Sequence, residues 1–182
     1  MPFVVAALVL IGAVALLDLL LTFAVIRRLK TYEPAAEGQP ASGPRPETIP
    51  EGLAVADFTA ATVDGSTLTW SAGDHDDMLF GFFSTSCSSC WRKVPEFIGT
   101  AGFRQLGRQQ VVAVVVGDAA EVPDSVAALR QIGRVVVEEL GGPVASAFGG
   151  VNGFPRFVLT DGQGRVAASS AVPQDLAQAV YA

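Results

Sequence analysis

The sequence predicts an α/β fold, a mixed sheet flanked by helices, preceded by one membrane-spanning helix. Three observations support this. Short β-branched or aromatic runs alternate with helical segments through residues 51–182. A long apolar stretch lies near the N-terminus, and a Cys-x-x-Cys pair follows one of the aromatic runs. The 182 residues suffice for one domain of ordinary size plus an appendage.

The composition argues against several classes of protein. Hydrophobic residues make up 50% of the chain, and the formal net charge is −6. This acidic balance differs from the basic footprint of a nucleic-acid binder, so we expect no nucleic-acid partner. Two cysteines and one histidine are too few for a disulfide framework or a closed zinc site, so we predict no metal and no cofactor.

Residues 1–30 are predicted to form a membrane anchor with a basic flank. The span covers residues 3–26, which at ~1.5 Å per residue crosses the ~30 Å hydrocarbon core of a bilayer. No Lys or Arg precedes Phe3, and the basic residues of 27–30 follow the span, unlike a cleaved signal peptide. Asp18 would lie near the bilayer centre, either contacting another membrane protein, such as an electron donor, or protonated and bonded within its own helix.

The anchor and the linker after it raise a question of orientation. Residues 31–50 hold five of the eleven prolines and predict an extended, semi-rigid linker. The positive-inside rule places the basic flank in the cytoplasm, and the domain of residues 51–182 with it. Single-pass attachment to the cell membrane is therefore expected, with the charge rule favouring the cytoplasmic side.

The domain is predicted to alternate strands and helices. Buried strands are expected where apolar residues run continuously, hairpins where a turn signal separates two strands, and helices where the apolar period is near 3.6. The expected strands are 55–60, 67–70, 78–83, 111–116, 135–137, 156–160 and 165–169, and the expected helices are 91 to about 106, 124–132, 143–148 and 173–181.

The Cys-x-x-Cys pair carries the predicted chemistry. Cys87 and Cys90 stand where a strand hands over to a helix N-terminus, whose dipole favours a thiolate. Cys87 is predicted to attack a disulfide, and Cys90, on the same side of the helix, to resolve the mixed disulfide as a Cys87–Cys90 disulfide. Hydroxyl side chains around the pair indicate a solvated loop rather than two inert buried thiols.

Further residues make this pattern more specific. Pro95 follows the pair inside the helix, and Gly153-Phe154-Pro155 precedes a strand. Together with the cysteines, these residues resemble the thioredoxin superfamily, in particular the membrane-tethered thiol–disulfide oxidoreductases of the TlpA, ResA and MauD-like types, over roughly residues 50–180. The resemblance implies a thioredoxin-like fold, protein thiols or disulfides as substrates, a membrane or soluble electron donor, and an extracytoplasmic domain. It therefore conflicts with the charge rule.

The resemblance also implies roles for residues beside the cysteines. It implies that the Phe154–Pro155 bond is cis and that the backbone of Phe154 pairs with an extended substrate chain. The alternative is an ordinary turn proline. Trp91 and Phe82 are candidates for substrate contact, although large aromatics beside a strand often belong to the core.

The chain departs from the thioredoxin pattern in three places. Gly81 stands where a buried acid is usual, Ser86 where Trp is favoured, and Ser88-Ser89 where Gly-Pro is favoured. The proton acceptor for Cys90 is thus unidentified. The candidates, unranked, are Asp57, Asp64 and Glu96. The direction of electron flow also stays open.

Two other functions compete with this prediction. A peroxiredoxin-like thiol peroxidase shares the fold, but its Pro-x-x-x-Thr-x-x-Cys signature fails because Phe80 and Ser84 occupy the required offsets before Cys87. A membrane copper chaperone uses two more widely spaced cysteines and a later histidine, whereas His75 precedes the pair in a solvated turn. Both alternatives fit less well than thiol–disulfide exchange.

Overall fold

A computed structural model describes residues 12, 49–71, 73 and 76–179. The chain divides into two compact units, Met1–Pro44 and Arg45–Ala182, and Gly12 is the one described residue of the first, within a helix. The predicted span of residues 3–26, most of the predicted linker, and His75 lie outside the described residues. The part of the chain that is described contains no helix with the length and apolar character needed to traverse a bilayer.

The second unit is built on a five-stranded mixed sheet in the order β5-β4-β3-β6-β7. The central strand β3 pairs in parallel with β4 and antiparallel with β6, while β5 and β7 form the edges. The strands are β3 (Met78–Ser84), β4 (Val111–Val116), β5 (Arg134–Glu138), β6 (Arg156–Thr160) and β7 (Val166–Ser170). The predicted mixed-sheet α/β class is confirmed.

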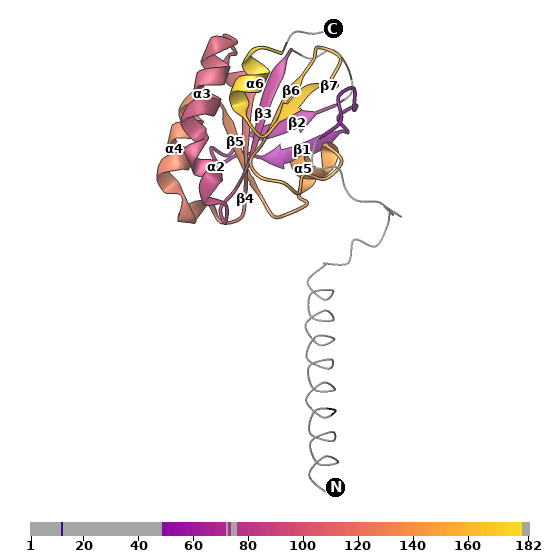
Figure 1. Cartoon of the computed structure of the whole chain (residues 1–182). Coiled ribbons are helices and arrows are strands. Elements are labelled where there is room, and N and C mark those ends of the chain that lie inside the picture. Colours follow the sequence, from indigo (N-terminus) through magenta and orange to yellow (C-terminus); the bar gives the residue numbers. More distant parts are fainter. Residues whose placement is uncertain (1–11, 13–48, 72, 74–75, 180–182) are drawn as a thin grey trace, which may run out of the picture. The chain divides into compact units, whose positions relative to one another are not determined.

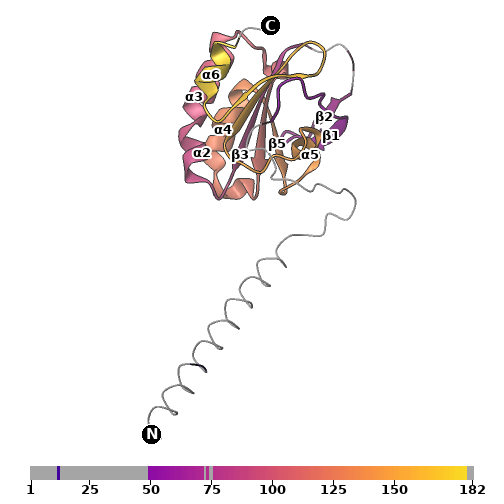
Figure 2. The same cartoon turned by 45° about the vertical axis from the view of Figure 1, so that its right-hand side comes forward.

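Two layers cover the sheet, one on each face (Figures 1 and 2). The helical layer comprises α2 (Ser88–Arg92), α3 (Val94–Phe103), α4 (Pro123–Ile132) and α6 (Pro173–Ala177). The opposite layer comprises a hairpin, β1 (Phe58–Ala61) with β2 (Thr67–Trp70), and the short helix α5 (Pro143–Ala147). Two short 3₁₀ helices, Arg108–Gln110 and Ala119–Glu121, lie on either side of β4 in the chain.

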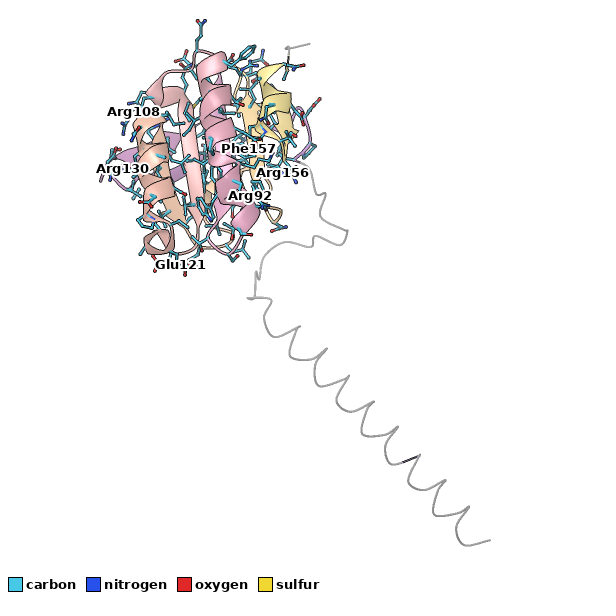
Figure 3. The ribbon with its side chains drawn as sticks, turned by 60° about the vertical axis from the view of Figure 1, so that its left-hand side comes forward. Arg92, Arg108, Glu121, Arg130, Arg156 and Phe157 are labelled. Atoms are coloured by element: carbon cyan, nitrogen blue, oxygen red, sulfur yellow. The ribbon has the colours of Figure 1, made fainter. Side chains whose placement is uncertain are left out.

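Central strands covered on both faces must be apolar throughout, and β3 and β4 are buried along their whole length. Their side chains alternate between two clusters. Phe80 and Phe82 point toward the hairpin and α5, whereas Leu79 and Phe83 point toward the helical layer. Figure 3 views the helical layer from outside, with Phe157 of β6 beneath α3.

The helix expected from residue 91 to about 106 is two helices, so that prediction is wrong in detail. Helix α2 begins at Ser88, and α3 begins at Val94 after a break at Lys93. Pro95 therefore stands in the first turn of α3 rather than inside a continuous helix. A proline there loses no helical hydrogen bond, because first-turn N–H groups have no intrahelical acceptor.

The other elements match the predictions with small shifts at their ends, except that the helix expected over 173–181 ends at Ala177. The strands at 67–70, 111–116 and 156–160 have the predicted bounds, and the helix at 143–148 ends one residue earlier. The first strand begins at Phe58 rather than residue 55. The reason is that Val55 N–H donates to the carbonyl of Gly164 and Ala56 N–H to that of Ala147, which takes this segment away from β2.

Candidate active site

The two cysteines lie at the end of the central strand, in what we call the dithiol loop (Ser84–Cys90). Cys87 N–H donates to the carbonyl of Ser84 at 3.1 Å, and Cys90 N–H donates to that of Cys87 at 3.0 Å. Cys87 has extended backbone geometry and is the residue immediately before α2, whereas Cys90 lies within it. The loop therefore leaves Cys87 partly exposed and buries Cys90 completely.

The surroundings of Cys87 favour its thiolate. Partial burial would by itself raise the pKa of this thiol, but hydrogen bonds with the side chains of Cys90 and Ser89 outweigh burial and place the pKa below its usual value. The Ser89 hydroxyl lies 3.1 Å from the Cys87 sulfur. A hydroxyl that donates to a thiolate stabilises the charged form, so Cys87 is the more reactive thiol.

Cys90 has the opposite character. It is fully buried in the cluster that contains Phe83, Val94 and Phe97. Burial is the largest cause that raises the pKa of Cys90 to about 12, and the contact with Cys87 acts in the same direction. One site thus holds an accessible, acidic thiol above a buried, weakly acidic one.

A second loop, which precedes β6 and contains Phe154 and Pro155, lies beside Cys87. The Phe154–Pro155 peptide bond is cis, as the resemblance implied. The Cys87 thiol donates to the carbonyl of Phe154 across 3.7 Å, and the Phe154 ring packs against both core clusters. The loop therefore presents Phe154 backbone beside the nucleophilic sulfur, while Pro155 leads into β6.

A glycine at the end of β4 lets Thr85 of the dithiol loop pack against the backbone. Gly117 follows β4 with φ of +112°, and a Cβ built there would collide with the Thr85 hydroxyl oxygen. Thr85 N–H in turn donates to the carbonyl of Val116. Thr85 can pack against this backbone only because residue 117 has no side chain.

The three candidate proton acceptors lie elsewhere. Asp57 is exposed ahead of β1, in the layer on the opposite face of the sheet. Asp64 lies in the β1–β2 turn, where hydrogen bonds from Thr62 and Ser66 lower its pKa to about 2. Glu96 pairs with Lys93 at 2.7 Å on the surface of α3.

The position of the usual buried acid is filled by aromatic rings. A Cβ built on Gly81 would lie 2.8 Å from Cε2 of Phe97 and 2.9 Å from Cε2 of Phe83. Such separations are closer than carbon atoms in contact adopt, so no side chain fits there without displacing a ring. The departure at Gly81 is therefore a packing feature of the cluster around Cys90.

The two candidate aromatics are placed differently. Trp91 is partly exposed and stacks on Phe83 with ring centroids 5.7 Å apart, close to the dithiol loop. Phe82 is fully buried on the opposite face, where its ring meets Phe148 at 5.4 Å. Phe82 is thus a core residue, and Trp91 alone of the pair stays a candidate for substrate contact.

Three contributors were not found from the sequence: the Ser89 hydroxyl, the Gly117–Thr85 contact and Phe97. The serine and the glycine had visible signals, since one lies between the cysteines and the other directly follows a buried strand. Phe97 carried none. In the described part of the chain, no three His, Cys, Asp or Glu residues gather in a way that could hold a metal ion.

Comparisons with known proteins address the fold. No protein-family model and no curated protein matches the sequence. Solved structures do. The thioredoxin domain of a thiol-disulfide oxidoreductase from Bacteroides vulgatus has a TM-score of 0.57 at 17% identity, covering 70% of this chain and 93% of that chain. A thioredoxin-family thiol:disulfide interchange protein from Chlorobium tepidum has a TM-score of 0.56 at 19% identity, covering 72% and 95%.

A third structure, a secreted disulfide oxidoreductase from Mycobacterium tuberculosis, has a TM-score of 0.53 at 16% identity and covers 66% of this chain and 91% of that chain. At such identities the likeness establishes the fold. The chain therefore has the thioredoxin fold that the sequence resemblance implied, with its dithiol loop after the central strand and a cis-proline loop beside it.

Proposed function

We propose that this protein is a thiol–disulfide oxidoreductase that exchanges disulfides with partner proteins. The contrast between Cys87 and Cys90 carries the proposal. A partly exposed thiol with a lowered pKa, directly above a buried thiol with a raised pKa, provides one attacking group and one resolving group. The solved structures of similar fold are described as thiol-disulfide oxidoreductases, which agrees with this assignment.

The reaction takes two steps. The Cys87 thiolate attacks one sulfur of a substrate disulfide, so that a Cys87–substrate bond forms and the other substrate sulfur leaves as a thiolate. Cys90, once deprotonated, attacks the Cys87 sulfur, and the Cys87–Cys90 disulfide forms as the second substrate thiolate leaves. The substrate gains two electrons and the domain loses them. An electron donor, in the membrane or soluble, then reduces the domain.

Recognition of the substrate would rely on backbone beside the sulfur. We assign the cis-proline loop, with Phe154 and Pro155, to binding an extended substrate segment, because the Phe154 carbonyl already lies 3.7 Å from the Cys87 sulfur. Trp91 would border this segment from the helical side. Main-chain pairing tolerates many side chains, which suits a protein that acts on several partners.

Reduction of insulin disulfides by the full-length protein, with a dithiol as electron source, tests the activity. We expect turnover by the native chain, none by Cys87→Ser, and a trapped mixed disulfide with Cys90→Ser. The absence of both insulin reduction and a redox-active Cys87–Cys90 disulfide would rule the proposal out. Peroxide consumption by the same preparation would favour the peroxidase alternative, and stoichiometric copper binding the chaperone alternative.

We further propose that residues 3–26 tether the domain to the cell membrane and that the domain lies on the extracytoplasmic side. The length and apolar character of this stretch support the tether, and the likeness to membrane-tethered oxidoreductases supports the side. The basic residues 27–30 argue for the cytoplasm. A reporter fused after Ala182, active on only one side of the membrane, decides between the two.

A further inference from the structure

The resolving thiol has a chemical requirement that its surroundings do not meet. Cys90 must lose its proton before it can attack, because the thiolate and not the thiol is the nucleophile. It is fully buried in an apolar cluster with Val94, Phe97 and Phe83. Fast resolution at neutral pH would therefore need a neighbouring base to accept this proton.

The central strand offers no such base. On β3, Leu79 and Phe83 belong to this cluster. Between them, Gly81 has no side chain, and the rings of Phe97 and Phe83 lie 2.8 and 2.9 Å from where its Cβ would be. On β4, the residues that face the same cluster are Val111, Ala113 and Val115. None of these can accept a proton.

The charged residues of the adjoining helices point outward or are already paired. Arg92 ends α2 and is exposed. Lys93 and Glu96 pair with each other at 2.7 Å, with 31% and 32% of their side chains exposed. On α4, Asp124 and Arg130 are exposed. On α6, Asp175 is exposed and accepts a hydrogen bond from the Ser170 hydroxyl.

The buried charges lie on the other face of the sheet. Arg156 of β6 pairs in register with Phe82, and Glu138 of β5 pairs with Val116, so both share the face covered by the hairpin and α5. Glu138 also accepts hydrogen bonds from the N–H groups of Val144 and Ala145. Burial is the largest cause of the raised pKa of Cys90, and it persists in the mixed disulfide, where Cys87 no longer carries a charge.

We propose that no side chain of the described domain takes the proton of Cys90, so that resolution waits for base from solvent and the Cys87 mixed disulfide is long-lived at neutral pH. This inference rests on the proposed function. Hydroxide converts Cys90–SH to Cys90–S⁻ and water. The new thiolate attacks the Cys87 sulfur, the Cys87–substrate bond breaks, and the departing substrate thiolate takes a proton from water. Meanwhile the partly exposed Cys87 sulfur keeps the bound substrate open to a competing second thiol.

The two steps can be timed separately in the full-length protein. The reduced chain is mixed with one equivalent of dithiobis-nitrobenzoate, which releases a coloured thiolate once when Cys87 attacks and again when Cys90 resolves. We expect the first phase to level off above the pKa of Cys87. We expect the second phase to be slower and to rise about tenfold per pH unit between roughly pH 6 and 9, as for a thiol far below its pKa.

A second phase that is independent of pH over this range would overturn the inference, because a base within the domain would then be at work. The proposed function fails in a different way. If no first phase appears, Cys87 is not the nucleophile and the exchange activity itself is refuted. A first phase followed by fast, pH-independent resolution refutes the inference alone.

A matched pair of double variants tests the cause. Phe97→Ala removes one of the two rings beside residue 81 and leaves room for the Phe83 ring to shift. Gly81→Asp then places a carboxylate there, while Gly81→Asn places an amide of the same shape. We expect the Asp pair to speed the second phase at pH 7 by roughly 10- to 100-fold and to flatten its pH profile. The Asn pair should keep the steep profile. Equal acceleration in both would mean that space, not base, limits resolution. If neither folds, the wild-type pH profile decides.

Discussion

The two faces of the sheet are both apolar, yet they differ in how they hold charge. The face under the hairpin and α5 accommodates Glu138 and Arg156, each only 8% exposed. The face under α2, α3, α4 and α6 holds Cys90 among aliphatic and aromatic side chains, and its described buried residues include no Asp, Glu, Lys or Arg. A buried charge persists where hydrogen-bond partners are supplied, and Glu138 has two backbone donors.

This difference explains how two thiols in one helical turn acquire opposite properties. Cys87 lies at the rim, where the Ser89 hydroxyl supports its charge. Cys90 lies on the face whose described buried residues carry no charge, and burial is the largest cause of its raised pKa. The pKa values of the two thiols thus depend on the face of the sheet that α2 covers as well as on the Cys-x-x-Cys spacing.

The largest effect is expected from truncating one ring on each face. Phe97→Ala and Phe148→Ala should each lower the free energy of unfolding by about 3–5 kcal/mol, since each removes a fully buried aromatic ring. Denaturant unfolding measures this loss. In a Cys87→Ser background, only Phe97→Ala should speed alkylation of Cys90, because Phe97 lies in its cluster. Equal acceleration by both would show that the faces are not independent.

Removing the buried carboxylate tests the opposite face. Glu138→Ala should cost about 2–3 kcal/mol of unfolding free energy, since the N–H groups of Val144 and Ala145 lose their acceptor. The exposed neighbour Glu139 serves as control, with Glu139→Ala expected within about 0.5 kcal/mol of wild type. The alkylation rate of Cys87 should not change, and a marked change would mean that Glu138 acts across the sheet.

The support under the dithiol loop can be probed with two glycines of positive φ. Gly117→Ala should cost about 1–3 kcal/mol and slow alkylation of Cys87, because the new Cβ displaces Thr85. Gly141→Ala has φ of +78° but nothing within 4 Å of the new Cβ, so it should show the backbone strain alone. If Gly117→Ala leaves the alkylation rate of Cys87 unchanged, the position of Thr85 does not affect the reactivity of Cys87.

The smallest effect is expected at the rim. Ser89→Ala removes the hydroxyl beside the Cys87 sulfur, so the pKa of Cys87 should rise toward its ordinary value. Below that pKa the rate of alkylation should fall about 3- to 10-fold, and the difference should vanish at high pH, where both thiols are ionised. Ser88→Ala, at the exposed position between the cysteines, is the control. A loss of rate that persists at high pH would indicate a structural defect instead.

Local pattern was enough to predict most of the fold. The β-branched run of residues 111–116 is typical of a central strand covered on both faces, and its bounds were predicted correctly. The Cys-x-x-Cys motif located the site because its two cysteines are close together in the sequence. The break at Lys93 was harder, because Pro95 is compatible with a kink or with a new helix start.

Contacts between distant residues could not be predicted. That Phe97 fills the space beside Gly81 depends on how α3 docks on β3, which no local pattern encodes. The same holds for Val55 and Ala56, whose hydrogen-bond partners Gly164 and Ala147 lie far along the chain. Sequence reasoning therefore identified the missing acid but not what replaces it.

The segment at the start of the domain, residues 49–54, covers the edge of the sheet at β7. Ile49 is buried in the core, Gly52 and Leu53 exchange backbone hydrogen bonds with Val166, and Ala54 bridges to Arg165 at the free side of β7. A fragment that starts after Ala54 would strip this cover and leave an open strand edge, a template for strand-to-strand aggregation. Any truncated form for crystallisation or assay should therefore begin ahead of Ile49.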